Sequence, residues 1–183
     1  MPRADGEPAP EPPEYRGRKL LVHRQRYVLP DGRRVELDAV RVPAVAYIVP
    51  LLDDGRVVLI RQYRPIVDAE IWELPAGTIE PGESPEVCAR RELVEEAGLA
   101  PETLEHLVTF HNSPGFSDEA VVVYAATGLT EVPDDRQGAE EQHMVVQRVP
   151  LDEALAMVDD GRITDAKSVI ALLALDRRRR TGG

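Results

Sequence analysis

Residues 77–99 read GTIEPGESPEVCARRELVEEAGL, and this stretch predicts a loop followed by a helix. Ser84 and Pro85 are typical of a helix start, because serine caps the first backbone N–H groups and proline is tolerated at the first helical position. Gly98 is typical of a helix end, because glycine readily adopts the left-handed conformation found there. We therefore expect a helix over residues 84–97.

Three glutamates, Glu92, Glu95 and Glu96, lie on one face of this predicted helix. With about 3.6 residues per turn, they fall within an arc of roughly 100°. Like charges at this spacing destabilise a bare helix, and hard cations such as Mg²⁺ prefer oxygen ligands. The cluster therefore indicates a divalent metal site, with a solvated acidic face as the alternative.

The same stretch fits the pattern Gx5Ex7REUxEExGU, where U is aliphatic, at every specified position. Those positions are Gly77, Glu83, Arg91, Glu92, Leu93, Glu95, Glu96, Gly98 and Leu99. The pattern is the Nudix box, and the chain resembles the Nudix hydrolases, which cleave nucleoside diphosphates linked to another moiety. The resemblance implies an α/β (α+β) fold: the Nudix α/β/α sandwich with a mixed central sheet, here preceded by an N-terminal β-hairpin.

The resemblance also implies the metal site. Glu92 and Glu96 are its expected principal ligands, Glu95 contributes directly or through water, and the backbone carbonyl of Ala76 completes it. The expected cofactor is Mg²⁺, with Mn²⁺ as a possible substitute. Bound metal polarises the phosphorus and activates water.

Other positions of the box are expected to be structural. We expect Glu83 and Arg91 to pair and to orient the loop against the helix, and Gly77 and Gly98 to shape the backbone. Cys88 stands where small residues are common in the family. We therefore interpret it as a packing residue and not as a nucleophile.

A second feature concerns the substrate. Pro114 follows Leu99 by 15 residues, within HNSPGFSDE. A proline at this offset marks the ADP-ribose pyrophosphatase subgroup, although Ser-Pro-Gly by itself is only a turn signal. RQYRP (61–65), WELPAG (72–77) and GRITDAKSVIALLAL near the C-terminus also resemble that subgroup. The implied reaction is Mg²⁺-dependent cleavage of ADP-ribose to AMP and ribose 5-phosphate.

Several residues outside the box are candidates for substrate contact. Guanidinium groups suit both phosphate binding and stacking, whereas a lone tryptophan beside an apolar run also suits the core. Glu73 and Glu119 are candidate ribose acceptors, with plain solvent exposure as the alternative. The complete set of candidates is Arg61, Arg64, Trp72, Glu73, Pro114, Gly115 and Glu119.

In the ADP-ribose subgroup, a glutamate on a late loop outside the box deprotonates the attacking water. The matching loop here is Gly128 to Gln142, before a predicted strand His143 to Val149. Glu141 keeps the subgroup's spacing to that strand, Glu140 is the fallback, and Glu131 lies too far upstream. If neither serves, Glu95 is the remaining candidate. The alternative is that both are solvated loop charges.

The rest of the chain fits this outline. Residues 1–14 are rich in proline and acids and are expected to be a disordered lead-in. A hairpin is expected over residues 15–43 around Pro30-Asp31-Gly32, as a dimerisation element, followed by the hydrolase domain over 44–176 and a basic tail over 177–183. Further strands are predicted at 44–52, 56–64, 71–74, 104–110 and 120–127, and helices at 151–160 and 165–176.

Composition narrows the functional classes. The 183 residues carry a net charge of -11, which repels a nucleic-acid polymer at long range. The longest apolar run, Val42 to Leu52, contains two prolines and is too short for a membrane helix. A single cysteine and an N-terminus without a signal pattern favour the cytoplasm.

Two alternatives to ADP-ribose hydrolysis stay open from sequence. One is a hydrolase of another nucleoside diphosphate sugar, such as a UDP- or GDP-sugar. The other is a non-catalytic module that binds a nucleotide sugar, which is disfavoured because such modules usually lack box glutamates. A homodimer is the expected assembly.

Overall fold

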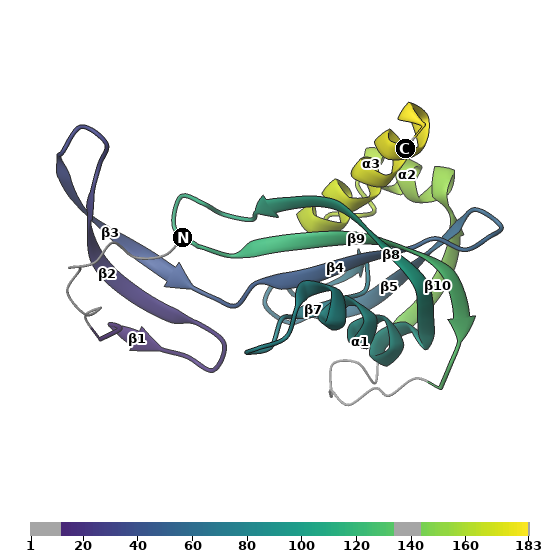
Figure 1. Ribbon diagram of the computed structural model, residues 1–183, viewed down its shortest axis with the longest axis horizontal. Helices are drawn as coiled ribbons and strands as arrows, with labels where there is room; N and C mark the ends of the chain where they lie inside the picture. Colours follow the sequence, from purple (N-terminus) through teal and green to yellow (C-terminus); the bar gives the residue numbers. More distant parts are fainter. Residues whose placement is uncertain (1–11, 134–143, 183) are drawn as a thin grey trace. The chain divides into compact units, whose positions relative to one another are not determined.

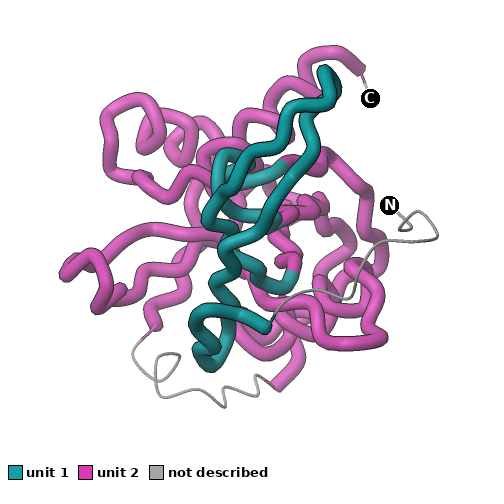
Figure 2. Tube along the Cα trace, turned by 90° about the vertical axis from the view of Figure 1, so that its left-hand side faces the viewer, with its two compact units in different colours: residues 1–43, 111–119 teal, residues 44–110, 120–183 magenta. Residues whose placement is uncertain are grey.

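The computed structural model describes residues 12–133 and 144–182. The chain divides into two compact units, of which unit 1 holds residues 1–43 and 111–119 and unit 2 holds residues 44–110 and 120–183 (Figure 2). Within the described part of the chain, no helix is both long and apolar enough to cross a membrane.

Unit 1 contains a three-stranded antiparallel sheet in the order β1 (Tyr15–Arg16), β2 (Leu21–Val28) and β3 (Arg34–Arg41). Strands β2 and β3 form the predicted hairpin. At their turn Gly32 has φ +83°, a conformation that glycine adopts at little cost. The hairpin prediction is confirmed, and the short β1 extends it to a sheet.

Unit 2 contains two sheets (Figure 1). The first has the order β7 (Ala76–Thr78), β4 (Val45–Pro50), β9 (Ala120–Glu131) and β8 (Leu99–His111), and it is mixed because β4 runs parallel to β9 and antiparallel to β7. The second is antiparallel, in the order β10 (Val145–Pro150), β5 (Arg56–Arg64) and β6 (Ala69–Glu73).

Helices pack on both sides of the strands in unit 2. Tyr47 and Val49 of β4 belong to a core shared with α2 (Leu151–Asp159) and α3 (Ala166–Thr181). Ala46 and Ile48 belong to a second core, shared with α1 (Pro85–Ala97). Alternate residues of a strand face opposite sides, so α1 and the α2–α3 pair cover opposite faces (Figure 1). The predicted α/β/α sandwich with a mixed sheet is confirmed.

Burial on both faces explains why β4 and β5 read as continuous apolar runs. Ile48, Val49, Val58 and Leu59 are fully buried. A strand covered on both sides shows no polar alternation. The same burial makes β4 a rigid support for the neighbouring β7, which leads into residues 77–99.

The structure corrects several element boundaries. Strand β9 continues to Glu131, so Gly128 to Glu131, predicted as loop, are strand; Gly128 has φ +62° and fits closely against Glu102. Strand β8 begins at Leu99, directly after α1, and β7 was not predicted at all.

Helix α3 also departs from its predicted end at Asp176. It continues to Thr181, so Arg177 to Arg180 form its last turns. Arginine is a good helix former, and cations are favourable at the negative helix C-terminus. Ion pairs of Arg178 with Glu105 and of Arg180 with Asp176 hold this end in place.

Candidate functional site

Helix α1 begins and ends as the sequence predicts. The Ser84 Oγ accepts a hydrogen bond from the Val87 N–H at 3.2 Å, and Gly98, at φ +63°, donates its N–H to the Val94 carbonyl at 3.0 Å. The buried face of the helix comprises Cys88, Ala89, Leu93 and Glu96. A carboxylate therefore lies on the face that packs on the sheet.

Glu96 connects α1 to the edge strand β7. Glu96 is only 8% exposed, and its Oε2 accepts the Ala76 N–H at 2.9 Å. Ala76 pairs with Tyr47 of β4 in the sheet. Glu96 and Ala76, whose side chain and backbone carbonyl are predicted metal ligands, are thus neighbours although they are 20 residues apart in sequence.

Arg91 gathers three carboxylates. It holds Glu83 in a bidentate pair, with Nε to Oε1 and Nη2 to Oε2 both at 3.0 Å. Its Nη1 donates to Glu92 Oε1 at 2.7 Å and to Glu95 Oε2 at 3.1 Å. Hydrogen bonds from Arg91 lower the pKa of Glu83, and the pairing with Glu83 raises the pKa of Arg91. Arg91 and Glu83 have the geometry expected of a structural pair.

The glutamate side chains of this cluster do not converge on a common metal position. Within residues 12–133 and 144–182, no three His, Cys, Asp or Glu side chains are arranged to hold a metal ion. Glu92 and Glu95 are directed to Arg91, and Glu96 is directed to the Ala76 N–H.

The residue types and the space around them nevertheless suit such an ion. A Cβ at Gly77 would overlap the carboxylate of Glu92, so the absence of a side chain there admits this carboxylate against the backbone. Carboxylate and carbonyl oxygens are the ligands that Mg²⁺ prefers. The donor set therefore fits the metal that the family implies.

Cys88 lies beneath this cluster. It is fully buried, with its Sγ 3.6 Å from the Gly77 carbonyl and 3.5 Å from the Thr78 carbonyl. Burial raises the pKa of the Cys88 thiol to about 12. A neutral, buried thiol is a poor nucleophile, which agrees with a packing role.

The candidates for substrate contact on β5 and β6 are engaged with one another. Glu73 is buried and accepts hydrogen bonds from Gln62 at 2.5 Å and from Arg64 at 2.7 Å. Arg61 lies over the Trp72 ring, with its guanidinium carbon 5.6 Å from the ring centroid. Trp72 packs against the core on the α2–α3 side.

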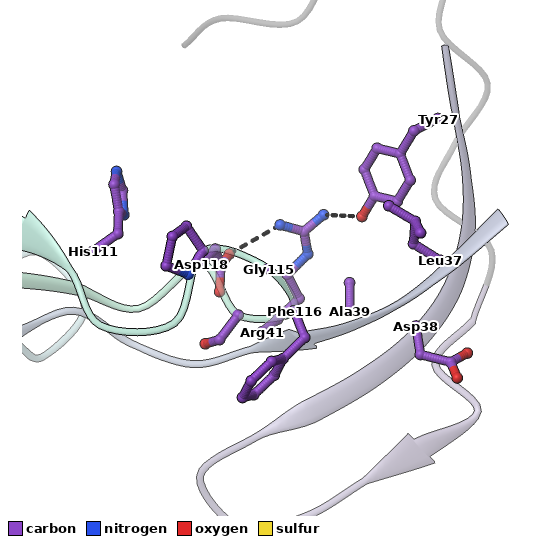
Figure 3. A pocket seen from close by; sticks show the side chains of 11 residues that line it. Tyr27, Leu37, Asp38, Ala39, Arg41, His111, Gly115, Phe116 and Asp118 are labelled. Carbon is purple, nitrogen blue, oxygen red and sulfur yellow. Dashed lines mark hydrogen bonds and ion pairs between the residues drawn. The ribbon is translucent and has the colours of Figure 1, made fainter. Parts of the chain in front are cut away.

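The remaining described candidates belong to unit 1. Pro114 and Gly115 line a pocket of about 310 Å³, together with Tyr27, Phe116 and other residues of unit 1 (Figure 3). Arg41 lies between two partners there, with Nη1 3.1 Å from Asp118 and Nη2 3.1 Å from the Tyr27 hydroxyl. Glu119 ends this loop and donates its N–H to the Ser117 hydroxyl.

The predicted residues are divided between the two units. The box glutamates, Arg91, Ala76 and Gly77 come together in unit 2, whereas Pro114, Gly115 and Glu119 belong to unit 1. Glu131 lies in β9 and pairs with Arg148 at 2.5 Å. The predicted bases Glu140 and Glu141 lie outside the described residues.

Sequence reasoning missed a polar group at the start of α3. Asp165, Lys167 and Ser168 interact there beside Tyr47 of β4. The spacing Asp-x-x-Ser is a recognisable helix cap signal, because the first side chain accepts the N–H of the third residue after it. Nothing in the sequence indicates that this cap also contacts the segment before Ala76.

Comparison with known proteins agrees with this geometry. Residues 41–172 match the family described as NUDIX domain. A methanol dehydrogenase activator of Bacillus methanolicus is 35% identical over 86% of this chain and 85% of its own. A protein of Bacillus subtilis (strain 168) named ADP-ribose pyrophosphatase is 32% identical over 86% of this chain and 85% of its own. A protein of Mycobacterium tuberculosis with the same name is 36% identical over 88% of this chain and 78% of its own.

A solved structure supports the fold. The crystal structure of an ADP compounds hydrolase superposes with a TM-score of 0.79, covering 97% of this chain and 99% of that one, at 24% sequence identity. The box matches at every specified position over residues 77–99, and the family match covers most of the chain, so the chain belongs to the Nudix hydrolase family.

Proposed function

We propose that the protein is a divalent-metal-dependent ADP-ribose pyrophosphatase that yields AMP and ribose 5-phosphate. The observation that carries this proposal is the contact between Glu96 on the buried face of α1 and the Ala76 N–H of β7, with Glu92 and Glu95 on the same helix. The position of Pro114 and the names of two relatives support ADP-ribose as the substrate.

Each residue of the cluster has a proposed task. Glu92 and Glu96 hold Mg²⁺ or Mn²⁺, with Glu95 and the Ala76 carbonyl completing the donor set. The ion, when bound, neutralises pyrophosphate charge and activates water. Arg91 keeps the carboxylates close to one another and, through Glu83, fixes the loop that precedes the helix.

The proton of the attacking water needs an acceptor. A carboxylate that binds a metal is a weak base, so we assign the proton to Glu141, with Glu140 as the fallback. This assignment is supported by sequence spacing alone. Arg61, Arg64 and the loop with Pro114 and Gly115 are proposed to contact the substrate, and Glu73 acts by fixing Arg64.

The proposed assembly is a homodimer formed through residues 15–43. In unit 1, as far as the structure describes it, Ala39 is the only buried hydrophobic residue. Three strands without a covered apolar face are marginal on their own. A second copy of the chain would supply the missing cover.

The deciding experiment measures hydrolysis of ADP-ribose, UDP-glucose, GDP-mannose and NADH with Mg²⁺. Product monoesters are counted as phosphate that alkaline phosphatase releases, because the intact substrates carry no monoester. We expect ADP-ribose to have the highest kcat/KM by at least about tenfold. A GDP- or UDP-sugar as the preferred substrate would contradict the substrate assignment.

Glu96→Gln tests the metal site and is expected to remove most of the activity. It removes one charge from the cluster while it keeps an oxygen that accepts the Ala76 N–H, so the fold is expected to persist and the metal-free protein to be at least as stable. Turnover near that of the wild type at saturating Mg²⁺ would overturn the assignment of Glu96 as a metal ligand.

A further inference from the structure

The polar group at the start of α3 is buried in an otherwise apolar region. Ser168 is fully buried, and the side chain of Asp165 is 7% exposed. Tyr47, on the neighbouring strand β4, is also buried. Polar side chains are costly in such a place unless their hydrogen bonds are made, so their partners indicate what the group does.

Asp165 orients the Ser168 hydroxyl. Its Oδ2 accepts the Ser168 N–H at 2.9 Å, as the cap of α3, and also the Ser168 Oγ–H at 2.8 Å. Its Oδ1 pairs with Lys167 Nζ at 3.1 Å, and that ammonium lies 5.5 Å from the centre of the Tyr47 ring. Because the hydroxyl proton goes to Asp165, the oxygen lone pairs of Ser168 are left to accept.

Ser168 also accepts a hydrogen bond from a residue outside α3. Ser168 Oγ accepts the N–H of Leu74 at 2.9 Å, across 94 residues of sequence. Leu74 is 2% exposed, so water cannot readily replace this partner. Removing the hydroxyl would leave the buried Leu74 N–H without its acceptor. An unpaired buried donor is costly, so we expect the backbone at Leu74 to shift.

The three residues from Leu74 to Ala76 are each tied to a different element. Leu74 is bonded to α3, the Pro75 carbonyl accepts the Ile48 N–H of β4 at 2.9 Å, and the Ala76 N–H is bonded to Glu96 of α1. The contact with Glu96 is thus made two residues from the contact with Ser168. Only Pro75 separates Leu74 from Ala76, and its fixed φ limits how far Leu74 can move without moving Ala76.

We infer that Ser168 and Asp165 are positioning residues for the glutamate cluster: they fix Leu74, and through it the distance and orientation at which Ala76 meets Glu96. The inference deepens the proposed function, on which it rests for the role of Ala76 and Glu96. Neither residue contacts the cluster directly. Outer groups that orient metal ligands typically change metal affinity or activity by about 10 to 100-fold when they are removed.

The test uses three variants of the full chain. Ser168→Ala removes the hydroxyl, and Ser168→Thr keeps it. Ala171→Gly is the matched control, because Ala171 is fully buried in the same helix and glycine destabilises a helix interior without changing the contact with Leu74. If Ser168→Ala does not fold, Ser168→Cys replaces it, because sulfur fills the space and is a weak acceptor.

Two readouts are independent of turnover. Amide hydrogen exchange of the peptide that spans residues 73–78 is measured on metal-free protein, and Mn²⁺ affinity is measured by electron paramagnetic resonance without substrate. In Ser168→Ala we expect faster exchange of this peptide and Mn²⁺ binding weaker by about tenfold or more. Ser168→Thr restores both, and Ala171→Gly leaves Mn²⁺ affinity unchanged.

The outcomes separate the inference from the proposed function. Wild-type Mn²⁺ affinity in Ser168→Ala overturns the inference, as does an equal loss of affinity in Ala171→Gly, which would mark a general effect of stability. If the wild-type protein hydrolyses ADP-ribose and binds Mn²⁺ in either of these cases, the proposed function stands. Failure of the wild type to bind Mn²⁺ overturns both.

Discussion

At the scale of single residues, the Glu83–Arg91 pair makes a prediction about pH. Glu83 loses its charge in acid, and hydrogen bonds from Arg91 lower its pKa in the folded protein. A carboxyl group with a lowered folded pKa stabilises the fold above its unfolded pKa, about 4.3 for glutamate, and loses that contribution as the pH falls through the folded value. Glu83→Gln removes this dependence.

We expect Glu83→Gln to lower the free energy of unfolding by about 1.5 to 3 kcal/mol at pH 7. The difference from wild type should narrow as the pH falls from the unfolded pKa, about 4.3, through the lower folded pKa of Glu83, below which both side chains are uncharged. Urea denaturation at several pH values measures it. Glu86→Gln, which removes an exposed pair with Arg90 and one charge in the first turn of α1, is the control. A difference that is independent of pH would contradict the assigned role of the pair.

A second prediction at this scale concerns the general base. Loss of a base slows the chemical step by roughly 10² to 10⁴-fold and leaves substrate and metal affinity nearly unchanged. We expect this for Glu141→Gln, with Glu140→Gln as its neighbour control, in kcat for ADP-ribose at saturating Mg²⁺. If both variants stay within about threefold of wild type, the loop supplies no base and Glu95 becomes the candidate.

At the scale of elements, α1 presents the glutamates only while its ends are fixed. Gly98 adopts φ +63°, a region that costs a residue with a Cβ about 1 to 2 kcal/mol. We expect Gly98→Ala to lower the free energy of unfolding by that amount. Gly115→Ala is the control, because Gly115 has ordinary φ and a Cβ there meets no atom within 4 Å. Equal stability of both variants in urea denaturation would contradict the prediction.

The same elements explain what sequence can and cannot predict. Local signals, namely the Ser84 cap, the Gly98 stop and the apolar runs of β4 and β5, predict the helix and the buried strands because each is set by neighbouring residues. The short β7 carries no such signal, since its pairing with β4 depends on the tertiary fold. The contact between Ser168 and Leu74 is missed for the same reason, because it joins residues 94 positions apart.

Glu73 and Arg64 show the corresponding limit at the site. From sequence each is a separate candidate for substrate contact, because a charged side chain after a strand is equally compatible with solvent and with ligand. In the structure Glu73 is buried and pairs with Arg64, although in the register of β5 and β6 Glu73 lies opposite Ile60 and Arg64 lies opposite Ala69. Pairing across strands depends on register, and register is not read from either strand alone.

At the scale of the whole molecule, the two faces of the sheet in unit 1 differ in character. The cross-strand pairs Arg24–Asp38 and Arg26–Glu36 place charges on one face. The other face, referred to below as the apolar face, carries Tyr27 opposite Val35 and Leu37 opposite Gln25, and Leu37 is 47% exposed. An apolar face on a sheet of three strands needs cover, and a second copy of the chain offers the same face in return.

We therefore predict a dimer in solution that depends on this apolar face. Light scattering coupled to size exclusion should give twice the 20.3 kDa mass of one chain at micromolar concentration. Leu37→Glu places a charge on the apolar face and should shift the mass to that of one chain, since burying an unpaired carboxylate is costly. Glu36→Gln alters the opposite face and should leave the dimer intact. A monomeric wild type excludes the dimer, whereas a dimer that persists in Leu37→Glu assigns the interface to another surface.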